Sequence, residues 1–182
     1  MIQLCCNTAA KAPWNQVLEM KMDVGIAVES DLEGILRLQD ANQPENGGTL
    51  SARFHRDRIV AMMQDMPLLV AREQGHVVGF LMTSSKKMNA DIPIIQAMLT
   101  AYPGSENAYV YGPICVAQAA RGKGLAQTLF NHMKGLLPGR EGILFIRRDN
   151  PASLQAHAKM GMSMMGMFTF NGQEHAVLSY WG

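Results

Sequence analysis

Apolar residues recur along the chain with two periods, and these periods predict short strands and amphipathic helices in a mixed order. Residues 24–28 alternate apolar and small side chains, as in a strand. Over about 30–41 apolar residues recur every three or four positions, which predicts a helix, and Ser30 and Glu33 are spaced as its capping box. The polar, glycine-rich stretch 42–51 predicts a loop.

The rest of the pattern continues this mixture of strands and helices. The expected elements are a helix with Phe54, Arg58, Met62 and Asp65 on its turns, a hairpin of 68–71 and 77–83, a short helix at 94–100, a strand at 109–116, a helix at 122–136, a strand at 143–147, a helix at 151–160, and two strands at 163–170 and 174–181. This order predicts an α/β fold, a single domain at 23–182 with a central mixed β-sheet flanked by helices. Residues 1–22 lack a clear period and are predicted to be an N-terminal extension.

Composition narrows the class of protein further. The chain has 182 residues, of which 48% are hydrophobic and 17% charged, enough apolar material for the core of one domain. The 16 basic residues nearly balance the 15 acidic ones, and the formal charge of +1 argues against a dedicated nucleic-acid-binding protein. No apolar run reaches the roughly 18–20 residues that span a bilayer, so an integral membrane protein is not expected.

The three cysteines indicate a reducing environment. Cys5 and Cys6 are adjacent and Cys115 is distant, which is neither a disulfide framework nor the paired spacing of a zinc site. The first residues have neither the basic start nor the apolar stretch of a secretory signal. We therefore expect a cytoplasmic protein without a bound metal.

The strongest chemical signal lies where the expected strand at 109–116 meets the following helix. A helix entered through Gly122 and Gly124 leaves backbone N–H groups unpaired, and its dipole adds about half a positive charge there. The missing Cβ atoms let a bulky anion approach, and Arg121 and Lys123 add positive charge. These features predict a diphosphate-binding turn. A P-loop requires a lysine after Gly124, and a dinucleotide fingerprint requires a third glycine; both are missing.

Two motifs in the second half of the chain resemble those of a known family. Arg121, Gly124 and Ala126 form an R-x-x-G-x-A sequence at the start of the expected helix. The second motif, N-x-x-S-x-x-x-H-x-x-x-G-M, is formed by Asn150, Ser153, His157, Gly161 and Met162. In this order and spacing, the two motifs are similar to the signature of the GNAT superfamily of acyl-CoA-dependent N-acetyltransferases, and together they cover about 109–165.

The resemblance implies a site for acetyl-CoA, the acyl donor of that family. Its diphosphate would bind at 122–127, and a bulge in the central strand, expected here at Gly112-Pro113, would open a slot for its pantetheine arm. The backbone of Ile114 and Val116 would bond to the arm, and the Val116 N–H would polarise the thioester carbonyl. The full set of expected coenzyme-binding residues is Ile114, Cys115, Val116, Arg121, Gly122, Lys123, Gly124, Leu125, Ala126, Gln127, Asn150 and Ser153.

Acyl transfer to an amine requires that the amine lose a proton and that the departing thiolate gain one. Many members of the resembled family have a tyrosine where this chain has His157, so His157 is a candidate acid, with helix packing as the alternative. No acidic residue lies within the central strand, so Glu106, Tyr109 and Tyr111 are candidate bases acting through water. Cys115 is expected to be a small buried hydrophobe, because nothing near it in the sequence would activate a thiol.

These inferences lead to one expected function and two alternatives. The expected function is that of an N-acetyltransferase, which moves the acetyl group of acetyl-CoA to a primary amine of a small molecule or peptide directly within a ternary complex. The missing acidic base leaves open a catalytically silent acyl-CoA sensor of the same fold. The 15 methionines, five of them at 160–167, leave open an interaction module that retains the fold. Neither a nucleic acid, a membrane nor a metal is an expected partner, and a homodimer stays open.

Overall fold

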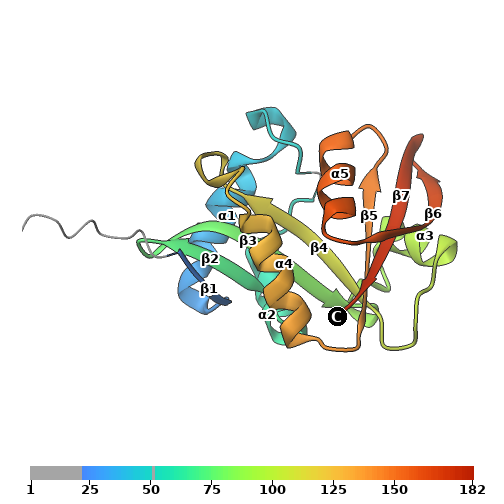
Figure 1. Cartoon of the computed structure of the whole chain (residues 1–182), viewed down its shortest axis with the longest axis horizontal. Helices are drawn as coiled ribbons and strands as arrows, with labels where there is room; N and C mark the ends of the chain where they lie inside the picture. The colour runs from blue at the N-terminus through green and yellow to red at the C-terminus, as the bar shows by residue number, and fades with distance from the viewer. Residues whose placement is uncertain (1–21, 51) are drawn as a thin grey trace, which may run out of the picture.

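A computed structural model describes residues 22–50 and 52–182, so the predicted extension at 1–22 lies outside it except for Met22. Within these ranges, strands form one sheet in the order β1-β2-β3-β4-β5-β7-β6 (Figure 1). The strands are β1 (Met22–Ile26), β2 (Leu69–Glu73), β3 (His76–Ser85), β4 (Tyr109–Val116), β5 (Glu141–Arg147), β6 (Ser163–Phe170) and β7 (Gln173–Trp181). Only β4 and β5 pair in parallel; the other neighbours are antiparallel. The predicted mixed sheet is confirmed.

Helices cover both faces of the sheet. On the face that Figure 1 shows in front, called the front face here, lie α4 (Leu125–Leu136) and α5 (Pro151–Lys159). The rear face is covered by α1 (Leu32–Ala41), α2 (Arg56–Asp65) and α3 (Pro93–Ala101). Short 3-10 turns are η1 (Glu29–Asp31), η2 (Pro44–Asn46), η3 (Lys87–Asn89) and η4 (Gln118–Ala120). No helix in the described part of the chain is long and apolar enough to cross a membrane.

The entrance to α1 differs from the prediction. The expected capping box of Ser30 and Glu33 is wrong, because Asp31 takes its place and accepts a bond from the Val28 N–H (2.7 Å). Arg72 donates to both carboxylate oxygens of Asp31, at 2.8 and 2.6 Å. Burial by itself would raise the pKa of Asp31, but the bonds from Arg72 and Val28 outweigh it and lower the pKa. This ion pair joins the start of α1 to β2.

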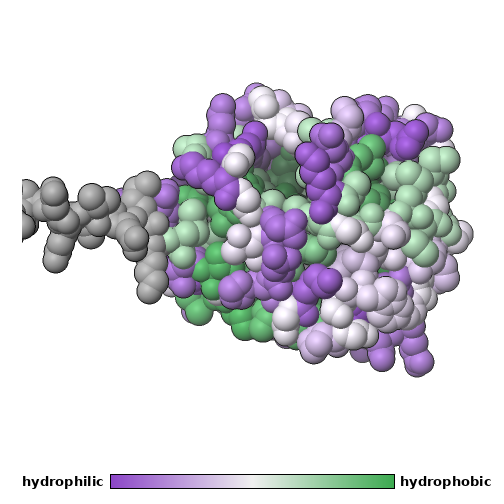
Figure 2. Space-filling model, viewed as in Figure 1, coloured by the Kyte–Doolittle hydropathy of each residue, from purple (hydrophilic) through white to green (hydrophobic). Residues whose placement is uncertain are grey.

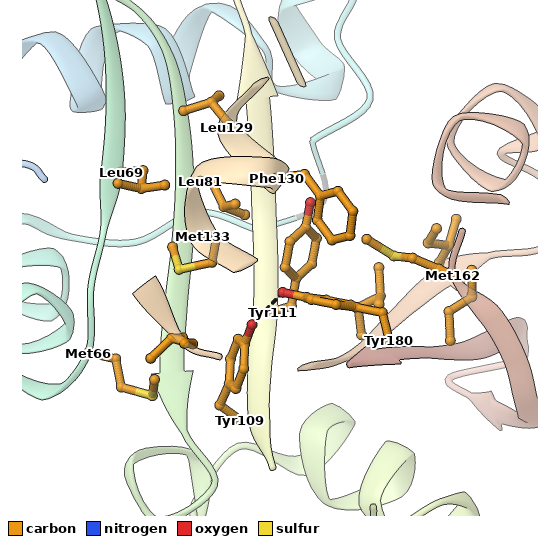
Figure 3. Close-up of a cluster of buried hydrophobic side chains, with 14 of the residues drawn as sticks. Met66, Leu69, Leu81, Tyr109, Tyr111, Leu129, Phe130, Met133, Met162 and Tyr180 are labelled. Atoms are coloured by element: carbon orange, nitrogen blue, oxygen red, sulfur yellow. Dashed lines mark hydrogen bonds between the residues drawn. The ribbon is translucent and has the colours of Figure 1, made fainter. Parts of the chain in front are cut away.

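The alternation of side chains along β4 divides the core into front and rear parts. Tyr109 and Tyr111 point to the front, where they pack with Phe130 of α4 (Figure 3). Val110, between them, points to the rear and packs with Ile143 under α3. An opening between β4 and β5 therefore connects the front part of the core with the rear part.

Candidate functional site

Strands β4 and β5 run together at one end and separate at the other. Two residue pairs join them, Tyr109 with Gly142 and Val110 with Ile143. Beyond these pairs β5 continues along β7 to its last residue, Arg147. The two central strands therefore enclose a V-shaped opening beyond Val110.

A bulge in β4 lies at the point of separation. Tyr111 pairs with Thr83 and Ile114 with Leu81, so β4 advances by three residues where β3 advances by two. The glycine of the Gly112-Pro113 pair has a φ of 101°, which side-chain-bearing residues rarely adopt. The bulge predicted at this pair is confirmed.

The separated part of β4 turns free backbone groups toward the opening. The Ala117 N–H donates to the Val78 carbonyl on the β3 side at 2.8 Å. Because successive residues of a strand point their N–H groups to opposite sides, the N–H of Cys115 also faces β3. The N–H groups of Ile114 and Val116 then face the opening, on the side expected for an extended ligand.

The opening leads into a cleft of about 710 Å³, whose mouth Figure 2 shows as a hollow beside α5. The cleft brings together these expected site residues: Tyr111, Ile114, Cys115, Val116, Arg121, Ala126, Asn150, Ser153 and His157. The residues Gly122, Lys123, Gly124 and Gln127 lie outside its lining, and Leu125 is buried in the front core. The structure does not bring Glu106 to the cleft. This residue is exposed in the turn before Tyr109, at the end where β4 and β5 are still paired.

The turn that enters α4 exposes a run of backbone donors. The N–H groups of residues 122–127 have no acceptor among the described residues, and the first bond of the helix runs from the Thr128 N–H to the Gly124 carbonyl (3.0 Å). Gly122 and Gly124 have φ values of 74° and 77°, and a Cβ on either would meet nothing within 4 Å. Open space in front of unpaired N–H groups at a helix N-terminus suits an anion.

Arg121 is held at the wall of the cleft next to this turn. Its Nε donates to the Val116 carbonyl at 3.1 Å, and its Nη2 donates to Asn42 Oδ1 at 2.5 Å. Asn42 in turn donates to the Leu38 carbonyl of α1 at 2.8 Å. The guanidinium therefore joins β4 to α1 and keeps its charge beside the exposed N–H groups.

Three residues of the second motif lie along one side of α5. Asn150 Oδ1 accepts from the Ser153 N–H (3.1 Å), which confirms the predicted N-cap. The His157 Nδ1–H donates to the Ser153 carbonyl (2.7 Å), so Nε2 carries a lone pair. Burial lowers the pKa of His157, and the bond to Ser153 offsets this only in part. This neutral imidazole has no free N–H, so its state does not favour the expected role as an acid.

Tyr111 packs edge-on against His157, with ring centroids 6.0 Å apart. Its hydroxyl is buried and has no partner among the described residues, whereas the hydroxyls of Tyr109 and Tyr180 bond to each other (Figure 3). Burial, and less strongly Tyr109, raises the pKa of Tyr111 far above its usual value, so the hydroxyl keeps its proton. A buried, unpaired hydroxyl is costly and marks a group available to a ligand.

Cys115 is buried, as predicted. Burial raises the pKa of its thiol to about 11, and the charge of Arg121 opposes this only weakly. The side chain therefore remains a thiol at neutral pH and is poorly suited to act as a nucleophile. Its contribution to the cleft is its position on β4.

Sequence reasoning missed His175. This residue is buried on β7 and lines the cleft, because the antiparallel pairing of β7 with β5 places it opposite Arg147. No motif in the sequence marks it, so the signal lies in the strand pairing alone. Among the described residues, no three His, Cys, Asp or Glu side chains form a group that could hold a metal ion.

Much of the chain matches a known family. The profile of the Acetyltransferase (GNAT) family matches residues 32–162. No curated protein sequence matches the chain. An N-acetyltransferase from Staphylococcus aureus Mu50 is 22% identical, with a TM-score of 0.64 over 88% of this chain and 98% of that chain.

Two further solved structures share the fold. A GNAT-family acetyltransferase from Streptococcus agalactiae 2603 is 16% identical, with a TM-score of 0.68 over 88% of this chain and 95% of that chain. A Salmonella typhimurium protein solved with its cofactor acetyl-CoA is also 16% identical, with a TM-score of 0.64 over 88% and 94% of the two chains. At these identities the likeness shows the fold alone.

Proposed function

Since this chain belongs to the acetyltransferase (GNAT) family, we propose that its domain, residues 23–182, binds acetyl-CoA in the cleft and transfers the acetyl group to a primary amine. One observation carries the proposal. The strands separate beyond Val110 to open a cleft, and Arg121 and Ala126, which line this cleft, belong to the turn that carries the unpaired N–H groups of 122–127. A slot for an extended arm and a site for an anion are the two features that binding of a coenzyme A thioester requires.

The described residues fit the parts of this substrate. Its diphosphate would bind the N–H groups of 122–127, with Arg121 beside them. The amides of its pantetheine arm would bond to the backbone of Ile114 and Val116, as a neighbouring strand would. Asn150 and the rest of α5 would form the opposite wall.

The proposed reaction exchanges a C–S bond for a C–N bond. The amine nitrogen attacks the thioester carbonyl, whose oxygen accepts a bond from the Val116 N–H as negative charge develops. The C–S bond breaks, the nitrogen loses a proton, the sulfur gains one, and the products are an N-acetyl amide and coenzyme A. We assign the donation to sulfur to Tyr111, because it lines the cleft and its hydroxyl has no other partner among the described residues. Its raised pKa makes it a weak acid, so its proton moves only as negative charge builds up on the sulfur. Neutral His157 packs against Tyr111 and positions it.

A binding assay and a turnover assay test the two halves of the proposal separately. Calorimetric titration with acetyl-CoA should show saturable binding, and thiol release in the presence of primary amines should show turnover, with the acetylated amine identified by mass spectrometry. Binding without release of coenzyme A in a broad amine panel would favour the silent sensor. No binding at millimolar acetyl-CoA would refute both readings and favour the interaction module.

A further inference from the structure

The cleft has a part on the rear face that the proposed coenzyme residues do not occupy. Leu144 and Ile146 of β5 belong to the front core, whereas Phe145 between them packs in the rear core with Val110. The cleft therefore passes through the strand opening and continues between α2 and α3. We call this part the rear chamber, and its apolar lining includes Phe54, Met62, Ile94, Ile95, Val110 and Phe145. Its polar lining includes Ser84 and Asn89, which hydrogen-bond to each other (2.8 Å).

The charged residues that line the cleft are all basic. No aspartate or glutamate among the described residues lines it, and its charged lining residues are Arg53, Arg121 and Arg147. Arg53 pairs with Glu45, and Arg147 bonds twice to Asp149, but neither acid reaches the cleft wall. An ammonium group held inside would have no carboxylate to compensate for the water that it loses.

One imidazole lies where the rear chamber meets β7. The His175 Nδ1–H donates to the Gln173 carbonyl (3.0 Å), which leaves the lone pair of Nε2 free. The ring stacks on Phe168 at 4.9 Å and lies edge-on to Phe145 at 5.4 Å. Burial, assisted by the nearby charge of Arg147, lowers the pKa of His175, and the bond to Gln173 and the charge of Asp149 oppose this only in part, so the ring is neutral at pH 7.

We propose that the rear chamber binds the acceptor as a primary amine on an apolar body, aralkyl or branched alkyl, with the amine nitrogen at His175 Nε2. This inference rests on the proposed acetyl transfer. The apolar body leaves water for contacts with side chains such as Ile94 and Phe145. As the C–N bond forms, the proton of the nitrogen passes to Nε2 and then to solvent. The C–S bond breaks, and the sulfur takes the proton of Tyr111, which water replaces after coenzyme A leaves the cleft.

A matched pair of small amines tests the substrate class. Isopentylamine and putrescine have equal numbers of non-hydrogen atoms, but the second amine of putrescine replaces the branched end. With saturating acetyl-CoA, kcat/KM from coenzyme A release should be at least about tenfold higher for isopentylamine and 2-phenylethylamine than for putrescine and a lysine peptide. Faster turnover of putrescine or the lysine peptide would overturn the inference and leave the proposed function standing. Failure to turn over any amine would refute the proposed function itself.

A charge introduced at Ile94 tests the location. This residue is the second of α3, where a glutamate suits the helix N-terminus, so the fold should tolerate the change. Ile94→Glu should raise the putrescine-to-isopentylamine ratio of kcat/KM by about tenfold, because it supplies the missing carboxylate. Ile94→Gln, of equal size and no charge, should slow isopentylamine without favouring putrescine. Identical ratios in the two variants would overturn the rear chamber as the acceptor site.

A substitution of His175 tests the position of the amine nitrogen. His175→Phe keeps an aromatic ring against Phe168 and removes the free nitrogen. We expect kcat/KM for isopentylamine to fall at least about tenfold while the Kd of acetyl-CoA is unchanged. Turnover at the wild-type rate would overturn the placement of the amine at this residue.

Discussion

Replacement of Gly124 by valine should separate coenzyme binding from folding. Gly124 has a φ of 77°, and a Cβ on it would meet nothing within 4 Å, so a side chain there strains the backbone without a clash. This left-handed conformation costs a residue with a Cβ about 1–2 kcal/mol. For a chain of 182 residues, that loss lowers Tm by about 2–8 °C, and the variant should still fold.

The effect on the ligand should be much larger than the effect on the fold. The valine side chain would fill the open space in front of the 122–127 N–H groups, where we propose that the diphosphate binds. Acetyl-CoA at 100 times its Kd should stabilise the wild-type protein by about 2.7 kcal/mol, which raises Tm by about 5–11 °C. Gly124→Val should lose most of this rise.

Gly139 provides a matched control for the backbone strain. It has a φ of 68°, a Cβ on it would also meet nothing within 4 Å, and it lies after α4, outside the lining of the cleft. Gly139→Val should lower Tm by a similar amount and keep the full rise with acetyl-CoA. The assay is thermal unfolding over a series of acetyl-CoA concentrations. A normal rise in Gly124→Val, or an equal loss in Gly139→Val, would refute the diphosphate site.

Three further predictions concern His157 and Tyr111, two ring-bearing residues that line the cleft. His157→Phe should lower kcat by roughly tenfold or more, because the imidazole no longer positions Tyr111, while the Kd of acetyl-CoA stays within about threefold. His157→Tyr should keep more activity, because its hydroxyl can itself donate to the sulfur. Equal, wild-type rates for both variants in steady-state assays would show that His157 only fills space. Tyr111→Phe removes an unpaired buried hydroxyl, so the free energy of unfolding of the variant, measured in urea, should be unchanged or about 1 kcal/mol higher. Its turnover should fall at least about tenfold. Unchanged turnover would exclude Tyr111 as the proton donor. Burial lowers the pKa of His157, so below pH 6.5 the unfolded chain takes up a proton that the folded chain excludes. Wild-type stability should therefore fall by up to about 1.4 kcal/mol per pH unit below that value, and His157→Gln should show a shallower fall; parallel urea profiles at pH 7.5 and 5.5 would contradict the buried neutral state.

Most helices and strands could be predicted from the sequence, because they depend on interactions between residues close together in the chain. The predicted strands at 109–116 and 163–170 match β4 and β6, since alternation and turn residues act within a few positions of the chain. The predicted helix at 122–136 began three residues early, because Gly122 and Gly124 adopt positive φ and remain outside α4. The capping box failed for a different reason: Arg72, distant in sequence, holds Asp31 at the cap position.

The sequence by itself determined the parts of the site that are local. The glycine turn before α4, the Asn150 cap and the bulge at Gly112-Pro113 follow from the conformations that these residues allow next to their neighbours. The proposed acyl-CoA site rests on these features, and the glycine turn and the Asn150 cap also belong to the two family motifs.

Only the tertiary structure decided the chemistry inside the cleft. Strand pairing brought His175 opposite Arg147, left Glu106 outside the cleft, and kept carboxylates away from its lining among the described residues. Packing left the Tyr111 hydroxyl without a partner and made His157 a neutral imidazole. The physical reason is that burial, protonation and charge balance depend on groups brought together from distant parts of the chain, and the spacing of residues along a sequence does not encode those encounters.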